Sequence, residues 1–265
     1  MKRSTKIITY VSAVIFLFSA FQLTRIGYDY ANNRTILAHA QDVFERLTET
    51  HEDEDVAYLN ERETVRALGG EALDDWNRVR PQFESLYALN EEIVGWIKVD
   101  GTPIDYPVLQ AVDNDYYLYR NYKGQQSNAG SIFMDFRNDV KRASDKNTVL
   151  YGHRMKDETM FYTLTRFMDE TFFNENRQIQ WDTAYDTFDA EIFAVYQTTT
   201  DVDYIATDFE TEADYATLLE TIKEQSIFDS PIDVTTDDRM LTLSTCDYTL
   251  DPTEGRFVVH AKLIE

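Results

Sequence analysis

The chain has 265 residues, of which 43% are hydrophobic and 14% aromatic, so it can bury the core of one or two folded domains. All 48 acidic residues follow Arg25, and a body this acidic argues against a nucleic-acid partner. Cys246 is the one cysteine, which excludes an intramolecular disulfide and a multi-cysteine metal site.

Residues 7–24 (IITYVSAVIFLFSAFQLT) carry no charge and lie between Lys6 and Arg25. As a helix they would span about 27 Å, close to the ~30 Å of a bilayer core, so they predict a transmembrane signal anchor. The basic residues of segment 1–6 predict that this tail is cytoplasmic and that the rest of the chain lies outside a single-pass cell-membrane anchor. A cleaved signal peptide is the alternative, because Ala38-His39-Ala40 fits a small-x-small site, although it lies well past the apolar run.

Residues 25–84 predict an extracytoplasmic helical stalk with further N-terminal helices. Apolar residues recur at helical spacing over 36–47. The acidic run 51–55 (HEDED) predicts a solvated hinge. A second helical pattern over 76–89 is expected to bend near Pro81.

Short apolar runs dominate residues 85–265. Asp100-Gly101 lies between apolar runs at 93–99 and 102–108 and is a strong hairpin signal. Such strands, without regular helical alternation, predict a mainly β fold with added helices: a closed antiparallel or mixed barrel of about eight strands. The remaining elements are predicted as strands at 131–134, 148–151, 179–181, 190–198, 240–245 and 256–263, and as helices at 157–168 and 211–225.

Cys246 follows the apolar run Thr242-Leu243-Ser244-Thr245, at the point where a strand gives way to a polar loop. A strand end can hold a side chain rigidly at a position that opens to solvent. An unpaired cysteine in an exported protein is a candidate reactive thiol, but a lone cysteine also serves as a small buried hydrophobe. Position alone leaves both interpretations open.

Two further residues occupy strand ends. His153 follows the strand pattern at 147–151 and is the one histidine placed like Cys246, so it is the candidate base for a thiol nucleophile. Arg256 opens the last strand, and an antiparallel return would bring it beside the thiol, where a permanent cation can stabilise an oxyanion. A structural histidine and a surface arginine are the alternatives for this pair.

Together, these residues and their surroundings resemble the sortase family of cysteine transpeptidases. The resemblance covers about residues 85–265, and its class B character lies in the helices before the barrel and the helix-bearing insert before the cysteine strand. The matching stretches are LNEEIVGWIKVDGTPIDYPVLQ (89–110), AGSIFMDFRND (129–139), NTVLYGHRM (147–155) and LTLSTCDYTLDPTEGRFVVHAKL (241–263).

The resemblance implies a mechanism and a catalytic set of Cys246, His153 and Arg256. The cysteine would attack a threonine carbonyl within a C-terminal sorting signal and form an acyl-enzyme. An amine of a peptidoglycan precursor or of a pilin lysine would then accept the acyl group. The histidine would move protons to and from the amines, and the arginine would hold the oxyanion or position the substrate.

The same resemblance implies substrate-binding positions before the nucleophile, in the helix-bearing insert and at the edge of the pocket. They are Ser244, Thr245, Tyr204, Ile205, Thr200, Tyr151 and Asn114. It implies no cofactor, in agreement with four histidines that show no metal-ligand spacing and with the lack of any nucleotide-binding fingerprint.

The expected partners are surface proteins or pilins that carry a sorting signal, the accepting amine and the membrane. A cysteine peptidase that resolves the acyl-enzyme with water would use the same residues. A non-enzymatic, anchored surface-binding domain with a structural cysteine is a third interpretation. Within the family, general surface anchoring, pilin polymerisation and anchoring of a haem-uptake protein all remain open.

Overall fold

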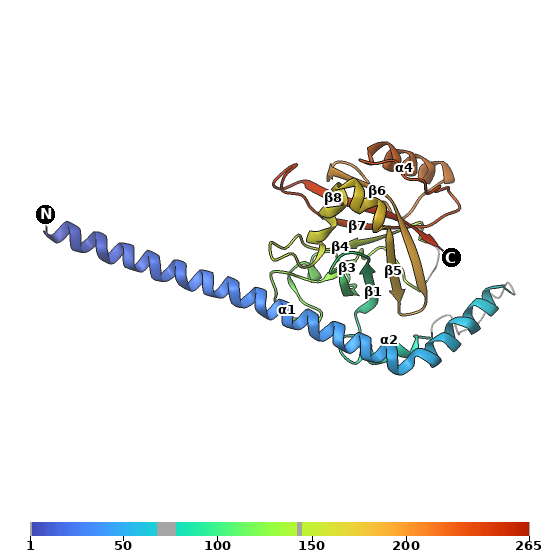
Figure 1. Cartoon of the computed structure of the whole chain (residues 1–265), viewed down its shortest axis with the longest axis horizontal. Helices are drawn as coiled ribbons and strands as arrows, with labels where there is room; N and C mark the ends of the chain where they lie inside the picture. The colour runs from blue at the N-terminus through green and yellow to red at the C-terminus, as the bar shows by residue number, and fades with distance from the viewer. Residues whose placement is uncertain (1, 68–77, 142–144, 265) are drawn as a thin grey trace.

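A computed structural model describes residues 2–67, 78–141 and 145–264. A long N-terminal helix runs below a β-barrel and curves beneath it (Figure 1). The helices are α1 (Lys2–Ala67), α2 (Pro81–Tyr87), η2 (Tyr116–Tyr119), η3 (Phe161–Met168), α3 (Glu170–Glu175) and α4 (Glu212–Gln225). The strands are β1 (Ile93–Val99), β2 (Asp105–Leu109), β3 (Ile132–Met134), β4 (Asn147–Tyr151), β5 (Gln178–Thr183), β6 (Thr187–Thr199), β7 (Met240–Cys246) and β8 (Gly255–Ile264).

The strands close into a mixed barrel in the order β1-β2-β3-β4-β7-β8-β6-β5. The β2–β3 and β4–β7 pairs are parallel, and the other neighbours are antiparallel. This confirms the predicted fold class and every predicted strand. The predicted Asp100-Gly101 hairpin joins β1 to β2, with Gly101 at φ 70°, a conformation that suits glycine.

The last strand shows how side-chain alternation builds the core. Phe257, Val259, Ala261 and Leu263 of β8 join the main cluster inside the barrel. Val258 points to the opposite face, where it packs with the apolar face of α4. Thr211 caps α4 by accepting a hydrogen bond from the Asp214 amide, which explains why the helix predicted at 211–225 begins there.

The predicted hinge at 51–55 is wrong, because α1 continues through it without a break. Asp55 is buried and pairs with Arg80, which also contacts Asp182 on β5 at 2.8 Å. The acidic run therefore contributes a buried anchor between helix and barrel as well as solvated charges. Arg80 lies 25 residues beyond Asp55, so a local charge pattern does not reveal the pair.

The structure also corrects two details of the other predicted helices. Pro81 occupies the first turn of α2 and begins the helix instead of bending it, since that position needs no backbone N–H donor. The part of the 76–89 pattern before residue 78 lies outside the described residues. Of the predicted 157–168 helix, only Phe161–Met168 is helical, as η3, and α3 follows it with Asp169 as its cap.

Candidate active site

The strand register brings the three predicted catalytic residues to one end of the barrel. Cys246 ends β7 and lies directly opposite Arg256 on β8. On the other side of β7, Tyr151 of β4 pairs in parallel with Ser244, so His153 extends past β4 beside the cysteine. We call this end, formed by the last residues of β4 and β7 and the first of β8, the Cys246 pole.

His153 has a defined hydrogen bond and a shifted pKa. Its Nε2 lies 2.7 Å from the carbonyl oxygen of Leu118. Because a carbonyl only accepts, Nε2 carries the proton and Nδ1 is the basic nitrogen. Burial lowers the pKa of His153 below its ordinary value, against the opposing effect of the bond to Leu118. The lowered pKa favours the neutral imidazole, the form that can accept a proton.

Arg256 is held by the backbone of its own hairpin. Its Nη1 donates to the carbonyls of Thr253, at 3.1 Å, and Gly255, at 2.9 Å. A guanidinium has five N–H donors, so this arrangement fixes the group and leaves donors for a substrate oxygen. Cys246, on the facing strand, is partly exposed and not disulfide-bonded.

Two residues next to the cysteine carry roles that the sequence interpretation did not include. Asp247 is buried, pairs with Arg154 at 3.2 Å and accepts hydrogen bonds from Gln197 and Thr249. Burial opposes ionisation, but these bonds lower the pKa of Asp247 overall and keep it a carboxylate. The run of nine loop residues after the cysteine gave no local signal for this, because two of the partners come from other elements.

Tyr248 is the second such residue, and it is 55% exposed beside the thiol. Partial burial and then the neighbouring Cys246 raise the pKa of its phenol. Tyr119 adds another exposed aromatic ring, whose centroid is 5.6 Å from that of His153. Apolar, aromatic surface around a nucleophile suits the binding of an extended peptide.

The predicted pocket residues on β7 and in the insert before α4 come together. Tyr204 and Ser244 are buried, and their hydroxyls lie 2.9 Å apart. Thr245 is buried too, and its hydroxyl has no hydrogen-bond partner among the residues that the structure describes. The Thr200 amide donates to the Glu254 carbonyl at 3.2 Å, which ties the end of β6 to the β7–β8 loop.

Two other predicted pocket residues contact the carboxylate of Asp135, which was not among the predicted site residues. The hydroxyl of Tyr151 and the amide of Asn114 donate to the same oxygen of Asp135, at 2.8 and 3.0 Å. Arg137 pairs with Asp135 at 2.8 Å and also donates to the carbonyl of Ile205. Asp135 therefore connects the β4 side of the pole to the insert before α4.

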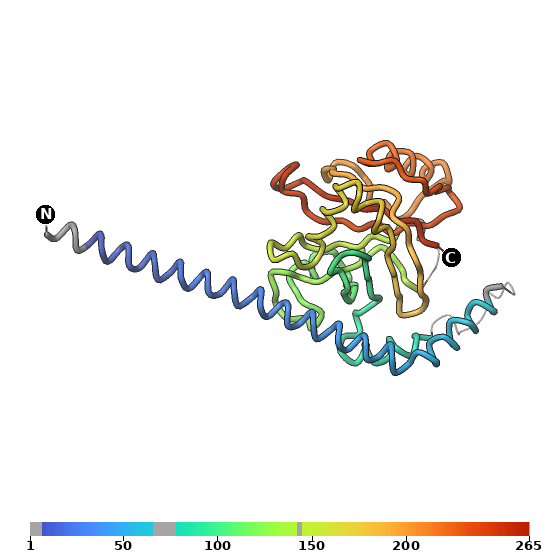
Figure 2. The backbone as a smooth tube through the Cα atoms, in the orientation of Figure 1, coloured from blue at the N-terminus to red at the C-terminus, as the bar shows by residue number. Residues whose placement is uncertain are grey.

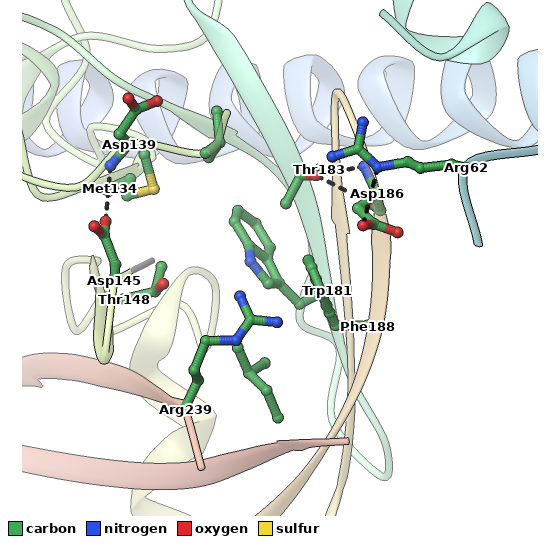
Figure 3. Close-up of a pocket in the computed structure, with 12 residues that line it drawn as sticks. Arg62, Met134, Asp139, Asp145, Thr148, Trp181, Thr183, Asp186, Phe188 and Arg239 are labelled. Atoms are coloured by element: carbon green, nitrogen blue, oxygen red, sulfur yellow. Dashed lines mark hydrogen bonds and ion pairs between the residues drawn. The ribbon is translucent and has the colours of Figure 1, made fainter. Parts of the chain in front are cut away.

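The opposite pole of the barrel has different chemistry. A pocket there is lined by Trp181, Arg62, Arg239 and several carboxylates, among them Asp186, and includes neither cysteine nor histidine (Figure 3). Within the described parts of the chain, no group of three or more His, Cys, Asp or Glu could hold a metal ion. The candidate nucleophile Cys246 and its candidate partners His153 and Arg256 lie together at the Cys246 pole.

Comparison with known families and curated proteins gives a consistent answer. A family model for the sortase domain matches residues 97–264. The chain is 39% identical to a sortase B of Listeria monocytogenes over 98% of this chain and 96% of that protein. It is 36% identical to a sortase B of Staphylococcus aureus over 100% of this chain and 98% of that one.

Solved structures agree with these matches. Sortase B from B. anthracis in complex with AAEK1 is 44% identical, with a TM-score of 0.73 over 90% of this chain and 99% of that one. A Staphylococcus aureus sortase B–substrate complex is 37% identical, with a TM-score of 0.76 over the same shares. A sortase B complexed with triglycine is 37% identical, with a TM-score of 0.74 over 89% of this chain and 98% of that one.

Proposed function

The chain belongs to the sortase family, class B, and is a cysteine transpeptidase; from that premise we propose that it cleaves a C-terminal sorting signal after threonine and transfers the new carboxyl end to an amine. Cys246, His153 and Arg256 are the proposed catalytic residues. The observation that carries this assignment is the register that pairs Cys246 with Arg256 and sets His153 past the end of the neighbouring strand.

In the proposed first step, Cys246 Sγ attacks the threonine carbonyl as His153 takes the thiol proton. The oxyanion of the tetrahedral intermediate is stabilised by Arg256, a cation that stays charged at any working pH. The peptide C–N bond then breaks, the leaving amine takes the proton from His153, and a thioester to Cys246 remains. The lowered pKa of His153 supports this role, because the neutral form is the base.

In the second step, the accepting amine attacks the thioester carbonyl and gives a proton to His153. The C–S bond breaks, the thiol regains its proton, and an amide bond joins the surface protein to its acceptor. The sortase B complex with triglycine supports an oligoglycine amine as the acceptor to try first. Resolution by water in place of the amine would make the protein a peptidase.

We also propose the role of the pocket residues. Tyr204 and Ser244 would form one wall of the sorting-signal groove, with Thr245, Thr200 and Ile205 alongside. Tyr151 and Asn114, both oriented by Asp135, would bind the peptide backbone from the β4 side. Two hydrogen-bonded groups support this division. One joins Tyr204 to Ser244, and the other joins Tyr151 and Asn114 to Asp135.

The proposed location follows from α1. One stretch of this helix is apolar enough to cross a membrane, and its side chains from residue 7 onward are largely exposed in the structure. We propose a cytoplasmic tail at 1–6, a transmembrane anchor at 7–24, a helical segment at 25–84 and an extracytoplasmic catalytic domain at 85–265. The enzyme would then meet substrates held in the same membrane.

The test is product analysis with a panel of LPxTG-like and NPxTx-like peptides, with and without triglycine. We expect one motif class to yield a peptide joined to triglycine through its threonine, and Cys246→Ala to yield none. Hydrolysis that triglycine does not divert would support the peptidase. An unreactive thiol and intact peptides throughout would support a binding domain and refute the enzymatic assignment.

A further inference from the structure

The barrel has a fixed orientation along α1. At the Cys246 pole, Asn128 contacts Asp29 at 2.7 Å and Tyr122 contacts His39 at 2.9 Å. At the opposite pole, the β5–β6 turn contacts Arg62 through Asp186 at 3.2 Å. Residues 122 and 128, beside the Cys246 pole, therefore lie against the part of the helix that follows the apolar run. Figure 2 shows this helix passing below the barrel.

The spacing along the helix places this pole close to a bilayer. The apolar run ends at Arg25, and α1 continues through Asp29 without a break. Four residues of helix rise about 6 Å, which is comparable with the roughly 5–7 Å of one headgroup layer. Arg62, at the far end, lies about 55 Å along the helix from Arg25. With residues 7–24 in the bilayer, one pole of the barrel would lie near the membrane surface and the other far from it.

The segment 116–134, beside the pole, differs in charge from most of the chain. Residues 116–134 contain no acid, although 48 of 265 residues are acidic, and they include Arg120 and Lys123. Lys123 is exposed, as are Gln126 and Asn128 in the same loop. A basic side chain near an anionic membrane surface is attracted to it, whereas a carboxylate there is repelled.

We infer that the loop 119–128 lies against anionic phospholipid headgroups and holds the Cys246 pole toward the bilayer. This inference rests on the proposed membrane anchor. Substrates held by the same membrane would then approach Cys246 from the membrane side, along a short path between the loop and the bilayer. The Arg80–Asp55 pair and the stacking of Phe44 on Trp96, 4.0 Å apart, keep the barrel from rotating away from α1.

The test measures lipid proximity in the full chain, reconstituted into vesicles of equal phosphatidylcholine and phosphatidylglycerol. Cys246→Ser leaves a cysteine-free background, into which Gln126→Cys or the matched Thr187→Cys introduces one label site. Both positions are exposed, one in the loop and one at the opposite pole. With a nitroxide on the lipid headgroup, we expect the label at 126 to lose about half its fluorescence and the label at 187 almost none. Equal quenching at both sites, or none at 126, would overturn the inference.

A pair of charge reversals tests the lipid chemistry. Lys123 lies over the Tyr122 ring at 5.5 Å, and Lys141, near the opposite pole, lies over Tyr185 at 5.8 Å. Lys123→Glu should reduce quenching at 126 at least about two-fold, while Lys141→Glu should leave it unchanged. Unchanged quenching in both variants, or equal quenching in phosphatidylcholine alone, would overturn the role of anionic lipid.

Failure of this inference can be told apart from failure of the proposed function. The quenching experiment uses an inactive protein, so it does not depend on catalysis. Flotation of the reconstituted chain with its vesicles reports the anchor, and loss of flotation would overturn the anchor and this inference together. Cleavage of soluble peptides, in contrast, tests the catalytic residues without a membrane.

Discussion

Acid should destabilise the barrel through His260, a histidine buried in the middle of β8. Tyr196 and Thr242 lie on its two ring nitrogens, each at 2.8 Å. Thr242 also donates to Asn147 at 2.6 Å, so it accepts from Nδ1–H, and the imidazole is neutral. Asn147 donates in turn to the carbonyl of Tyr204, which makes His260 part of the support for the proposed pocket.

The magnitude follows from the shift in pKa. Burial lowers the pKa of His260 from 6.5 to about 3. Since the unfolded chain binds the proton more readily, the stabilising contribution is complete above pH 6.5 and is lost as the pH falls toward 3. At about 1.4 kcal/mol per pH unit, His260 alone should remove roughly 2 kcal/mol between pH 7 and pH 5.

The assay is urea unfolding at both pH values, on a chain that begins at Ile26 and so keeps the described hydrogen bonds between α1 and the barrel. His260→Gln removes the titrating group, so its free energy of unfolding should fall by about 2 kcal/mol less than that of the wild type. Equal losses in the two proteins would show that His260 does not cause the acid sensitivity. A variant too unstable to unfold cooperatively can be replaced by His260→Asn, with the same comparison.

Other substitutions separate structural from catalytic roles. Arg80→Met removes the partner of the buried Asp55 carboxylate and of the partly buried Asp182, and should cost about 3–5 kcal/mol in urea unfolding, against at most about 1 for the exposed Arg78→Met. His153→Gln should lower kcat/KM for peptide cleavage about 10²–10⁴-fold, while His51→Gln, on the surface of α1, should leave it unchanged. Tyr204→Phe removes one buried hydrogen bond, so we expect about a five-fold loss of kcat/KM; no loss, or a loss like that of His153→Gln, would contradict its place in the pocket wall.

The parts of the fold that sequence predicts are those with a local cause. Asp100-Gly101 marks its hairpin because few residues adopt a positive φ, and alternation along 256–263 assigns the faces of β8 because its period is two. The strand ends at Cys246 and His153 can also be predicted, because each follows a short apolar run in the sequence. Their closeness is a property of the barrel order, which no local pattern encodes.

The failures have non-local causes. The run 51–55 looks like a solvated hinge until Arg80, from a later segment, is seen to pair with Asp55. Asp135 is one of many acids in an acidic chain, and only the fold brings Tyr151 and Asn114 into hydrogen-bond contact with it. In a chain with many acids, the sequence alone does not show which carboxylates have structural roles, because their partners lie far away in the sequence.

The most direct test of the central claim is to trap the acyl-enzyme. The chain that begins at Ile26 would be mixed with the sorting-signal peptide identified from the panel, quenched in acid and examined by intact and peptide mass spectrometry. We expect a thioester on Cys246 that ends in threonine, is released by hydroxylamine and is absent in Cys246→Ala. Cleavage of the peptide at the same rate by Cys246→Ala, or an adduct on any other residue, would contradict this expectation.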